Sequence, residues 1–184
     1  MTDLAGEPSE RRATGPLCDL VPLIEAAVED YGLAPGGSVR YVEADVPHHP
    51  LLVSGAAADV AALIDAAIAR VAARPGINRR IVAGARLDLD RVQLWVGHGN
   101  GVGGHAAVPL TLDELEPRGP PAARAAFAAE RARMLHLLDV LDATLVIGVD
   151  VVLDAIVLSI AFPALGGRRR RRFRSFVGTG RPSS

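Results

Sequence analysis

The chain has 184 residues, of which 49% are hydrophobic and 22% charged, and its formal net charge is −1. This composition is ordinary for a soluble globular protein, and the length predicts one domain with a full core. The single cysteine, Cys18, excludes an internal disulfide, and the absence of lysine excludes Schiff-base chemistry and the lysine of a P-loop.

The N-terminal segment, residues 1–16, is polar and rich in Gly and Pro, and it lacks the apolar core of a signal peptide. We expect this segment to be disordered. A helix is predicted over Asp19–Tyr31, with its first residue as the N-cap. Ser38–Asp45 follows and alternates polar and apolar residues as a strand does.

A second helix is predicted from Ser54 or Gly55 to Ala73. The next two segments, Arg80–Leu87 and Val92–Val96, predict a β-hairpin because a short polar turn separates two apolar runs.

Residues 98–104, with the sequence HGNGVGG, predict a flexible turn, and Val108–Pro121 reads as irregular because it contains several prolines. A third helix is predicted over Ala122–Leu141. Thr144–Val149 and Ala155–Phe162 are predicted strands, the second of them at an edge of the sheet. No apolar stretch reaches the ~20 residues of a membrane-spanning helix, so we expect a cytoplasmic protein.

The C-terminal end is strongly basic. Residues 168–184 contain seven Arg and no acidic residue, whereas the preceding 167 residues carry 13 Arg against 21 Asp and Glu. We therefore expect a domain over residues 17–165 and a basic disordered tail over residues 166–184. The order of the elements predicts an α/β (α+β) two-layer sandwich, a mixed sheet with about three helices on one face. Trp95 and Phe127 are expected to pack in its core.

This order of elements resembles the ATPase domain shared by histidine kinases, gyrase-type topoisomerases, Hsp90 and MutL. Four segments carry the resemblance across residues 17–165: CDLVPLIEAAVEDYG, ALIDAAIARV, VQLWVGHGNGVGG and DATLVIGVDVVLDAIVLSIAFPA. The first is similar to the helix that opens a kinase catalytic domain, and the second to the family's Asn-Leu-Leu-x-Asn-Ala helix. The third lies where the family has a strand and then Asp-x-Gly-x-Gly, and the fourth resembles the closing strands.

The residues that bind nucleotide in this family are replaced here. The resemblance places Ala62 and Ala66 where the family has its two asparagines, and the second asparagine is a magnesium ligand there. Alanine offers no oxygen to a cation that requires oxygen ligands. His98 or Gly99 stands where the family has the aspartate that recognises adenine. The family's second glycine-rich box has no counterpart, because AARAAFAAERARMLHLL is predicted as a helix.

We therefore expect a degenerate domain without ATP, magnesium or catalytic residues, which regulates signalling by binding another protein. The resemblance points to a bacterial two-component or sigma-factor pathway, and a homodimer is an option. The helix pair that carries the phosphorylated histidine in sensor kinases has no counterpart in the first 16 residues.

An alternative hypothesis is a divergent ATP-binding kinase or ATPase. A shift of one residue in the second helix would put Asp65 at the magnesium position, and Asp59 is a further option. The nucleotide would then contact Asn100, Gly101 and Gly103.

Two further features of the sequence have simpler explanations than a binding site. The histidines of the predicted loops (His48, His49, His98 and His105) would have to converge to bind a metal, and we expect exposed loop residues and no metal site. The arginines of the tail could contact nucleic acid or an anionic membrane, or simply keep a disordered tail solvated. These arginines are Arg168, Arg169, Arg170, Arg171, Arg172 and Arg174.

Overall fold

The computed structural model describes residues 15–32, 41–73, 80–89, 91–98, 108–112, 120–150, 155–163 and 165. Three helices are present in these ranges: α1 (Leu20–Gly32), α2 (Ala57–Ala73) and α3 (Pro121–Val140). The strands are β1 (Leu17–Asp19), β2 (Tyr41–Asp45), β3 (Leu52–Ser54), β4 (Arg80–Asp88), β5 (Arg91–His98), β6 (Val108–Leu110), β7 (Thr144–Asp150) and β8 (Ala155–Ala161). The predicted α+β class is confirmed.

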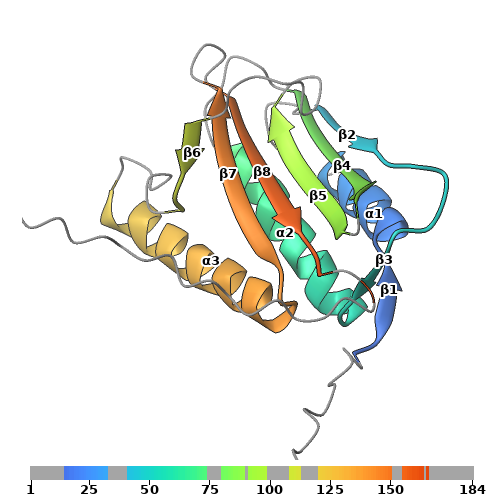
Figure 1. Cartoon of the computed structure of the whole chain (residues 1–184). Helices are drawn as coiled ribbons and strands as arrows, with labels where there is room; N and C mark the ends of the chain where they lie inside the picture. Colours follow the sequence, from blue (N-terminus) through green and yellow to red (C-terminus); the bar gives the residue numbers. More distant parts are fainter. Residues whose placement is uncertain are drawn as a thin grey trace, which may run out of the picture.

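Six strands form one mixed sheet in the order β2-β4-β5-β8-β7-β6. β2 pairs with β4 in parallel, and the other neighbours are antiparallel. β1 and β3 form a separate antiparallel pair. All three helices cover one face of the six-stranded sheet, with α2 packed between α1 and α3 (Figure 1). No helix within the described ranges is long and apolar enough to cross a membrane.

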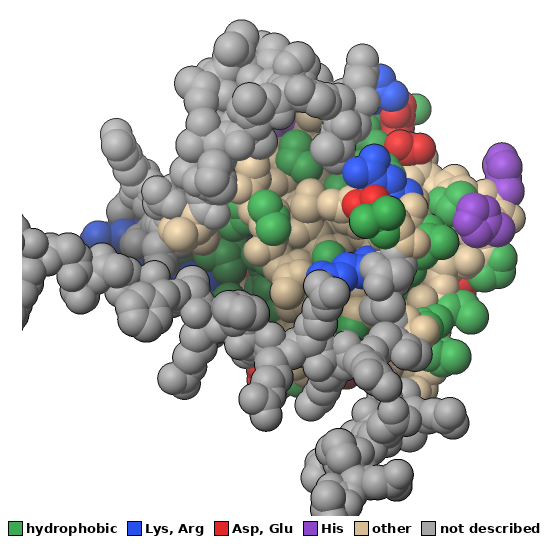
Figure 2. Space-filling view, in the orientation of Figure 1, with side chains coloured by type: hydrophobic (Ala, Val, Ile, Leu, Met, Phe, Trp, Pro, Cys, Tyr) green, Lys and Arg blue, Asp and Glu red, His purple; other side chains and the backbone are tan. Residues whose placement is uncertain are grey.

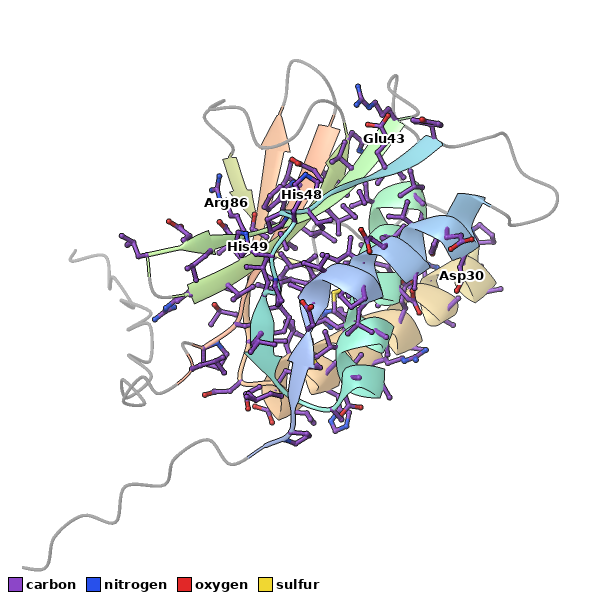
Figure 3. The ribbon with its side chains drawn as sticks, turned by 90° about the vertical axis from the view of Figure 1, so that its right-hand side faces the viewer. Asp30, Glu43, His48, His49 and Arg86 are labelled. Carbon is purple, nitrogen blue, oxygen red and sulfur yellow. The ribbon has the colours of Figure 1, made fainter. Side chains whose placement is uncertain are left out.

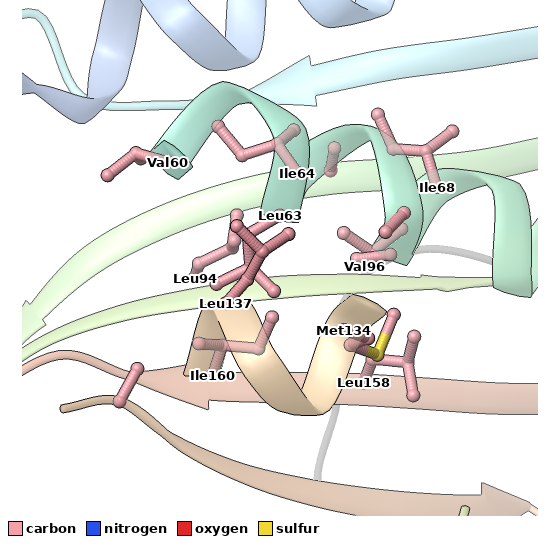
Figure 4. Packing of buried hydrophobic residues seen from close by; sticks show 14 of the residues in the cluster. Val60, Leu63, Ile64, Ile68, Leu94, Val96, Met134, Leu137, Leu158 and Ile160 are labelled. Carbon is pink, nitrogen blue, oxygen red and sulfur yellow. The ribbon is translucent and has the colours of Figure 1, made fainter. Parts of the chain in front are cut away.

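The core lies between the helices and the covered face of the sheet. α2 contributes Leu63, Ile64 and Ile68, which are fully buried. They meet residues from the central strands and from α3, and these are Leu94, Val96, Leu158, Ile160, Met134 and Leu137 (Figure 4). Burying one such aliphatic side chain contributes about 1.5–3 kcal/mol, so this layer holds the fold together.

Local interactions fix the ends of the helices. The predicted N-cap is confirmed, because Asp19 Oδ1 accepts a hydrogen bond from the Val21 amide at 3.1 Å. The same oxygen accepts one from the Leu51 amide at 3.0 Å, which ties α1 to the segment before β3. At the end of α3, the Ala143 amide donates to the Leu138 carbonyl at 2.8 Å, and Asp142 takes a φ of 50°. This is the Schellman arrangement that terminates many helices.

Three short strands were not predicted. β1, β3 and β6 have three residues each, too few for an alternating pattern to be visible. β6 corrects the prediction that Val108–Pro121 is irregular. It contains Pro109, which is tolerated because β6 is an edge strand that pairs with β7 alone.

Two further predictions are corrected by the order of the strands. Ala155–Phe162 was expected at an edge of the sheet, but β8 lies between β5 and β7. Trp95 does not enter the core. Its neighbours Leu94 and Val96 do, and side chains alternate along a strand, so Trp95 points to the open face of the sheet. Phe127 is buried between the helices, as expected.

Candidate functional site

The residues aligned with the family's asparagines lie on α2, the central helix. Ala66 is 9% exposed and belongs to the core, and Ala62 is half-buried against it. Neither side chain carries an oxygen atom that a cation could bind. Asp65 lies between them in sequence but on the outer side of the helix, where it is exposed. Asp59 lies in the first turn of α2 and is half-buried.

A buried arginine joins α2 to α3 one turn after Ala66. Arg70 is 8% exposed, and its guanidinium carbon lies 4.4 Å from the centre of the Phe127 ring. Such a stack is worth roughly 0.5–2 kcal/mol, more when it is desolvated. Burial lowers the pKa of Arg70, and the charge of Glu130 on α3 opposes that shift. Arg70 and Phe127 thus fill the contact between the two helices.

Charged side chains gather on the outer surface of the helices around Asp65. Burial is the main cause that raises the pKa of Asp65, and repulsion by Asp30 of α1 adds to it, while Arg133 of α3 lowers it. The pKa of Tyr31 is raised by burial and then by the charges of Asp65 and Glu130. Figure 3 shows Asp30 near the end of α1 on this side of the molecule.

The residues around Asp65 and Arg70 come from all three helices, and we call them the helical cluster. Its members are Asp30, Tyr31, Asp65, Arg70, Phe127, Glu130 and Arg133. The cluster contains more acidic groups than its two arginines can neutralise. It can therefore attract cationic groups, whereas an anionic ligand would be repelled by the carboxylates around Asp65.

The predicted histidine positions are partly wrong. His98 was expected in an exposed loop, but it is the last residue of β5 and only 9% exposed. His48 and His49 are exposed between β2 and β3, as Figure 3 shows. Among the described residues, no three His, Cys, Asp or Glu side chains are grouped so as to hold a metal ion. Cys18 is half-buried, and burial followed by the charge of Asp19 raises its pKa.

Several predicted contact residues lie outside the described ranges. They are Asn100, Gly101 and Gly103 of the glycine-rich turn, His105, and the arginines of the tail (Arg168, Arg169, Arg170, Arg171, Arg172 and Arg174). Of the alternative nucleotide contacts, the structure therefore places only Asp65 and Asp59.

Sequence reasoning missed Arg70 and Glu130. A signal for Arg70 is present in the sequence: it follows Leu63, Ala66 and Ala67 at helical spacing, so a charged residue stands on an otherwise apolar helix face. Glu130 shows no such signal, because α3 is weakly amphipathic and rich in alanine.

Comparisons with known proteins identify the fold. No family model matches the sequence, and no curated protein matches it significantly. Among solved structures, a mycobacterial sensor histidine kinase, MprB, is similar with a TM-score of 0.54 and 13% identity, covering 82% of this chain and 98% of that one. The ATP-binding domain of PrrB from Mycobacterium tuberculosis gives 0.52 and 14% identity, covering 82% and 98%.

A third structure, the catalytic domain of the histidine kinase ThkA, gives a TM-score of 0.51 at 9% identity, and the match covers 81% of this chain and 96% of that one. Identities this low show the fold and nothing finer. This chain has the fold of the ATP-binding catalytic domain of histidine kinases.

Proposed function

We propose that this chain is a non-catalytic regulatory domain that acts by binding another protein in a bacterial two-component or sigma-factor pathway. The observation that carries the proposal is the chemistry of α2. The sequence resemblance aligns Ala66, which is buried in the core, with the family's magnesium-binding asparagine, and Arg70 fills the contact with α3 one turn later.

Magnesium demands oxygen ligands in near-octahedral geometry, and an alanine pair supplies none. Arg70 packs on Phe127 in the contact between α2 and α3, so a ligand that entered this contact would have to break the stack. Losing this stack would cost roughly 0.5–2 kcal/mol. Both features support a domain that acts through its surface and not through a bound nucleotide.

The second candidate function is nucleotide binding through different residues. One observation favours it: Asp65 is crowded by Asp30, so a bound cation would relieve their repulsion. The fold is also shared with a protein described as an ATP-binding domain. Under this hypothesis Asp65 or Asp59 would hold the magnesium ion.

Thermal unfolding with magnesium and ATP or ADP separates the two functions. A ligand that binds only the folded state at 100 times its Kd stabilises by about 2.7 kcal/mol, which is several degrees in Tm for a chain of this size. The regulatory proposal expects no change in Tm at millimolar nucleotide. A magnesium-dependent rise would contradict it.

If Tm rises, three variants locate the cation. Asp65→Ala or Asp59→Ala should abolish the rise, whereas Glu25→Ala, an exposed carboxylate on α1, should leave it intact. The proposal also predicts a protein partner, which is sought by titrating this chain against any response regulator or sigma factor encoded beside it. At least one should bind with a Kd of about 10 μM or tighter, and no binding to any of them would count against the proposal.

A further inference from the structure

Most of the large apolar side chains that stay exposed lie at one end of the molecule. Among the described residues, nine such side chains are at least 42% exposed. Six of the nine belong to this end, and they are Leu17, Leu52, Leu87, Leu89, Val140 and Leu165. Exposed apolar residues that stand singly need no explanation, but a group of them at one place does.

The tip of the β4–β5 hairpin lies beside the end of β8. Leu87 pairs with Val92 across the hairpin. The carbonyl oxygen of Val92 accepts a hydrogen bond from the Phe162 amide at 2.9 Å, and Leu165 follows three residues later. The exposed leucines of the hairpin and the last described residue are therefore at the same end of the sheet.

The β1–β3 pair and the end of α3 lie at this end too. Leu17 pairs with Ser54, and a Cβ atom on the next residue, Gly55, would lie 2.3 Å from Leu141 Cδ2, directly after α3. β7 begins there, paired with the last residue of β8. Figure 1 shows β1, β3, the start of α2 and the end of α3 together at the lower end of the molecule, and Figure 2 shows hydrophobic side chains at its lower right border. We call the six exposed side chains the apolar end.

Leu89 is the most exposed member of the apolar end, and its backbone is strained. Its side chain is 95% exposed, and its φ is 56°. This left-handed conformation is unfavourable for leucine, whereas glycine and asparagine adopt it more readily. A leucine at this turn therefore gains no burial within the chain to offset the strain. Strained positions of this kind are found where a residue contacts something outside its own domain.

A strongly basic segment follows the apolar end in the sequence. Residues 168–184 contain seven Arg and no acidic residue, and Phe173 and Phe176 stand among these arginines. A residue spans at most about 3.6 Å, so Arg168 lies within about 11 Å of Leu165. Clusters of this many arginines are typical of segments that bind the headgroups of anionic lipids.

The distribution of charge favours one orientation towards a negative surface. The carboxylates of the elements at this end are Asp19, Asp59, Asp88, Asp90, Asp139 and Asp142. Arg86 and Arg91 of the hairpin and the seven arginines of the tail outnumber these six. Other carboxylates lie farther away: α1 begins beside β1, and Asp30 near its other end is about 15 Å along the helix.

We propose that the apolar end binds an anionic lipid bilayer, with the leucines of the β4–β5 hairpin entering the interface and the arginines of the tail contacting lipid phosphates. Stable attachment to a membrane surface needs two signals, because neither a small apolar group nor a basic segment suffices alone. The apolar end supplies the first signal, and the tail supplies the second. A nucleic acid would use the arginines but leave the exposed leucines without a role.

Cosedimentation of the full chain with vesicles tests the inference. Phosphatidylcholine vesicles with roughly 30% phosphatidylglycerol should bind the chain, and pure phosphatidylcholine vesicles should bind it about tenfold more weakly. About 0.5 M NaCl should remove most of this difference, because salt screens the charges. Five joint substitutions in the tail should do the same, and they are Arg168→Gln, Arg169→Gln, Arg170→Gln, Arg171→Gln and Arg172→Gln.

Leu89→Asn isolates the contribution of the apolar end. Asparagine adopts the φ of this position more readily than leucine, so the variant keeps the hairpin and loses only the apolar side chain. Binding to the anionic vesicles should weaken about fivefold. The matched control is Tyr41→Asn, since Tyr41 is 61% exposed and pairs with Arg80, at the opposite end of β4. This control should bind as the wild type does.

Equal binding to anionic and neutral vesicles, or none to either, would overturn the inference. Undiminished binding by Leu89→Asn would overturn it too, because the arginines alone would then account for the attachment. Tighter binding to a DNA duplex of about 20 base pairs than to the vesicles, per mole of phosphate, would assign the arginines to nucleic acid and equally overturn it. None of these outcomes depends on a nucleotide or a protein partner, so the inference and the proposed function can fail separately.

Discussion

The two faces of the six-stranded sheet are built from different residues by the same strands. The covered face carries large branched aliphatics such as Leu94, Leu158 and Ile160, all 0% exposed. The open face carries glycines, small residues and one tryptophan. The open face also carries charged side chains, which are Glu43 and Asp45 on β2 and Arg80 and Arg86 on β4.

The fold requires a strongly apolar face on one side of the sheet only. Helix-covered aliphatics are needed to bury enough area for a stable two-layer sandwich. The glycines, valines and charged side chains of the open face are not needed for that purpose.

The largest difference in the free energy of unfolding is expected between substitutions at adjacent residues of β8 that point to opposite faces of the sheet. Leu158→Ala should cost about 3 kcal/mol, because a fully buried side chain is lost and a cavity remains. Val157→Ala, on the open face, should cost less than half as much. Chemical denaturation of both variants under conditions that keep the chain monomeric measures the difference. Equal losses would show that the open face is as tightly packed as the core.

A smaller loss of stability is expected when the space beneath the indole ring of Trp95 is filled. Gly84→Ala places a methyl group 2.4 Å from Trp95 and 2.6 Å from the Asp45 carbonyl oxygen, so the ring must move. Strain of this kind costs about 1–3 kcal/mol. Gly32→Ala is the control, because nothing lies within 4 Å of its Cβ position. Tryptophan emission and Tm should change in the first variant, and an unchanged emission would contradict the described packing.

The smallest effect on stability is expected in the helical cluster, at Asp65. The pKa of Asp65 is raised in the folded state, so the folded chain holds this ionised carboxylate less well than the unfolded chain does. Stability is therefore lost as pH rises from the ordinary aspartate pKa of about 4 through the raised value. Asp65→Asn should raise Tm by about 1 °C at pH 7 and by nothing below about pH 4.

Glu25→Gln, another exposed carboxylate of the helical layer, serves as the control for Asp65→Asn and should show no comparable gain. If Asp65→Asn lowers Tm at pH 7, the carboxylate is held by a favourable contact instead, and the electrostatic account of the helical cluster is wrong.

Much of the sheet was predictable because its long strands are apolar runs separated by helices or by short polar turns. All five predicted strands exist, and the positions of the three helices agree to within a few residues. The three-residue strands were not predictable, since pairing with a distant partner creates them. The direction of Trp95 was available in the sequence, because Val92, Leu94 and Val96 alternate with Gln93, Trp95 and Gly97.

The candidate site was less predictable than the fold. Ala62 and Ala66, which the sequence resemblance aligns with the family's asparagines, could be named from the sequence. The stack of Arg70 on Phe127 was not, because it depends on how α3 packs against α2. The cluster around Asp65 likewise needs three helices, distant in sequence, to be placed together.

The parallel pairing of β2 with β4 has a consequence for the order of folding. The hairpins β4–β5 and β7–β8 close short loops and can form within microseconds. β2 can join β4 only after the chain has made a crossover through α2, which closes a much longer loop. Since non-local pairing slows folding, docking of β2 beside a preformed β4–β5 hairpin is expected to be a late step. Until then the apolar edge of β4 stays open to pairing with other chains.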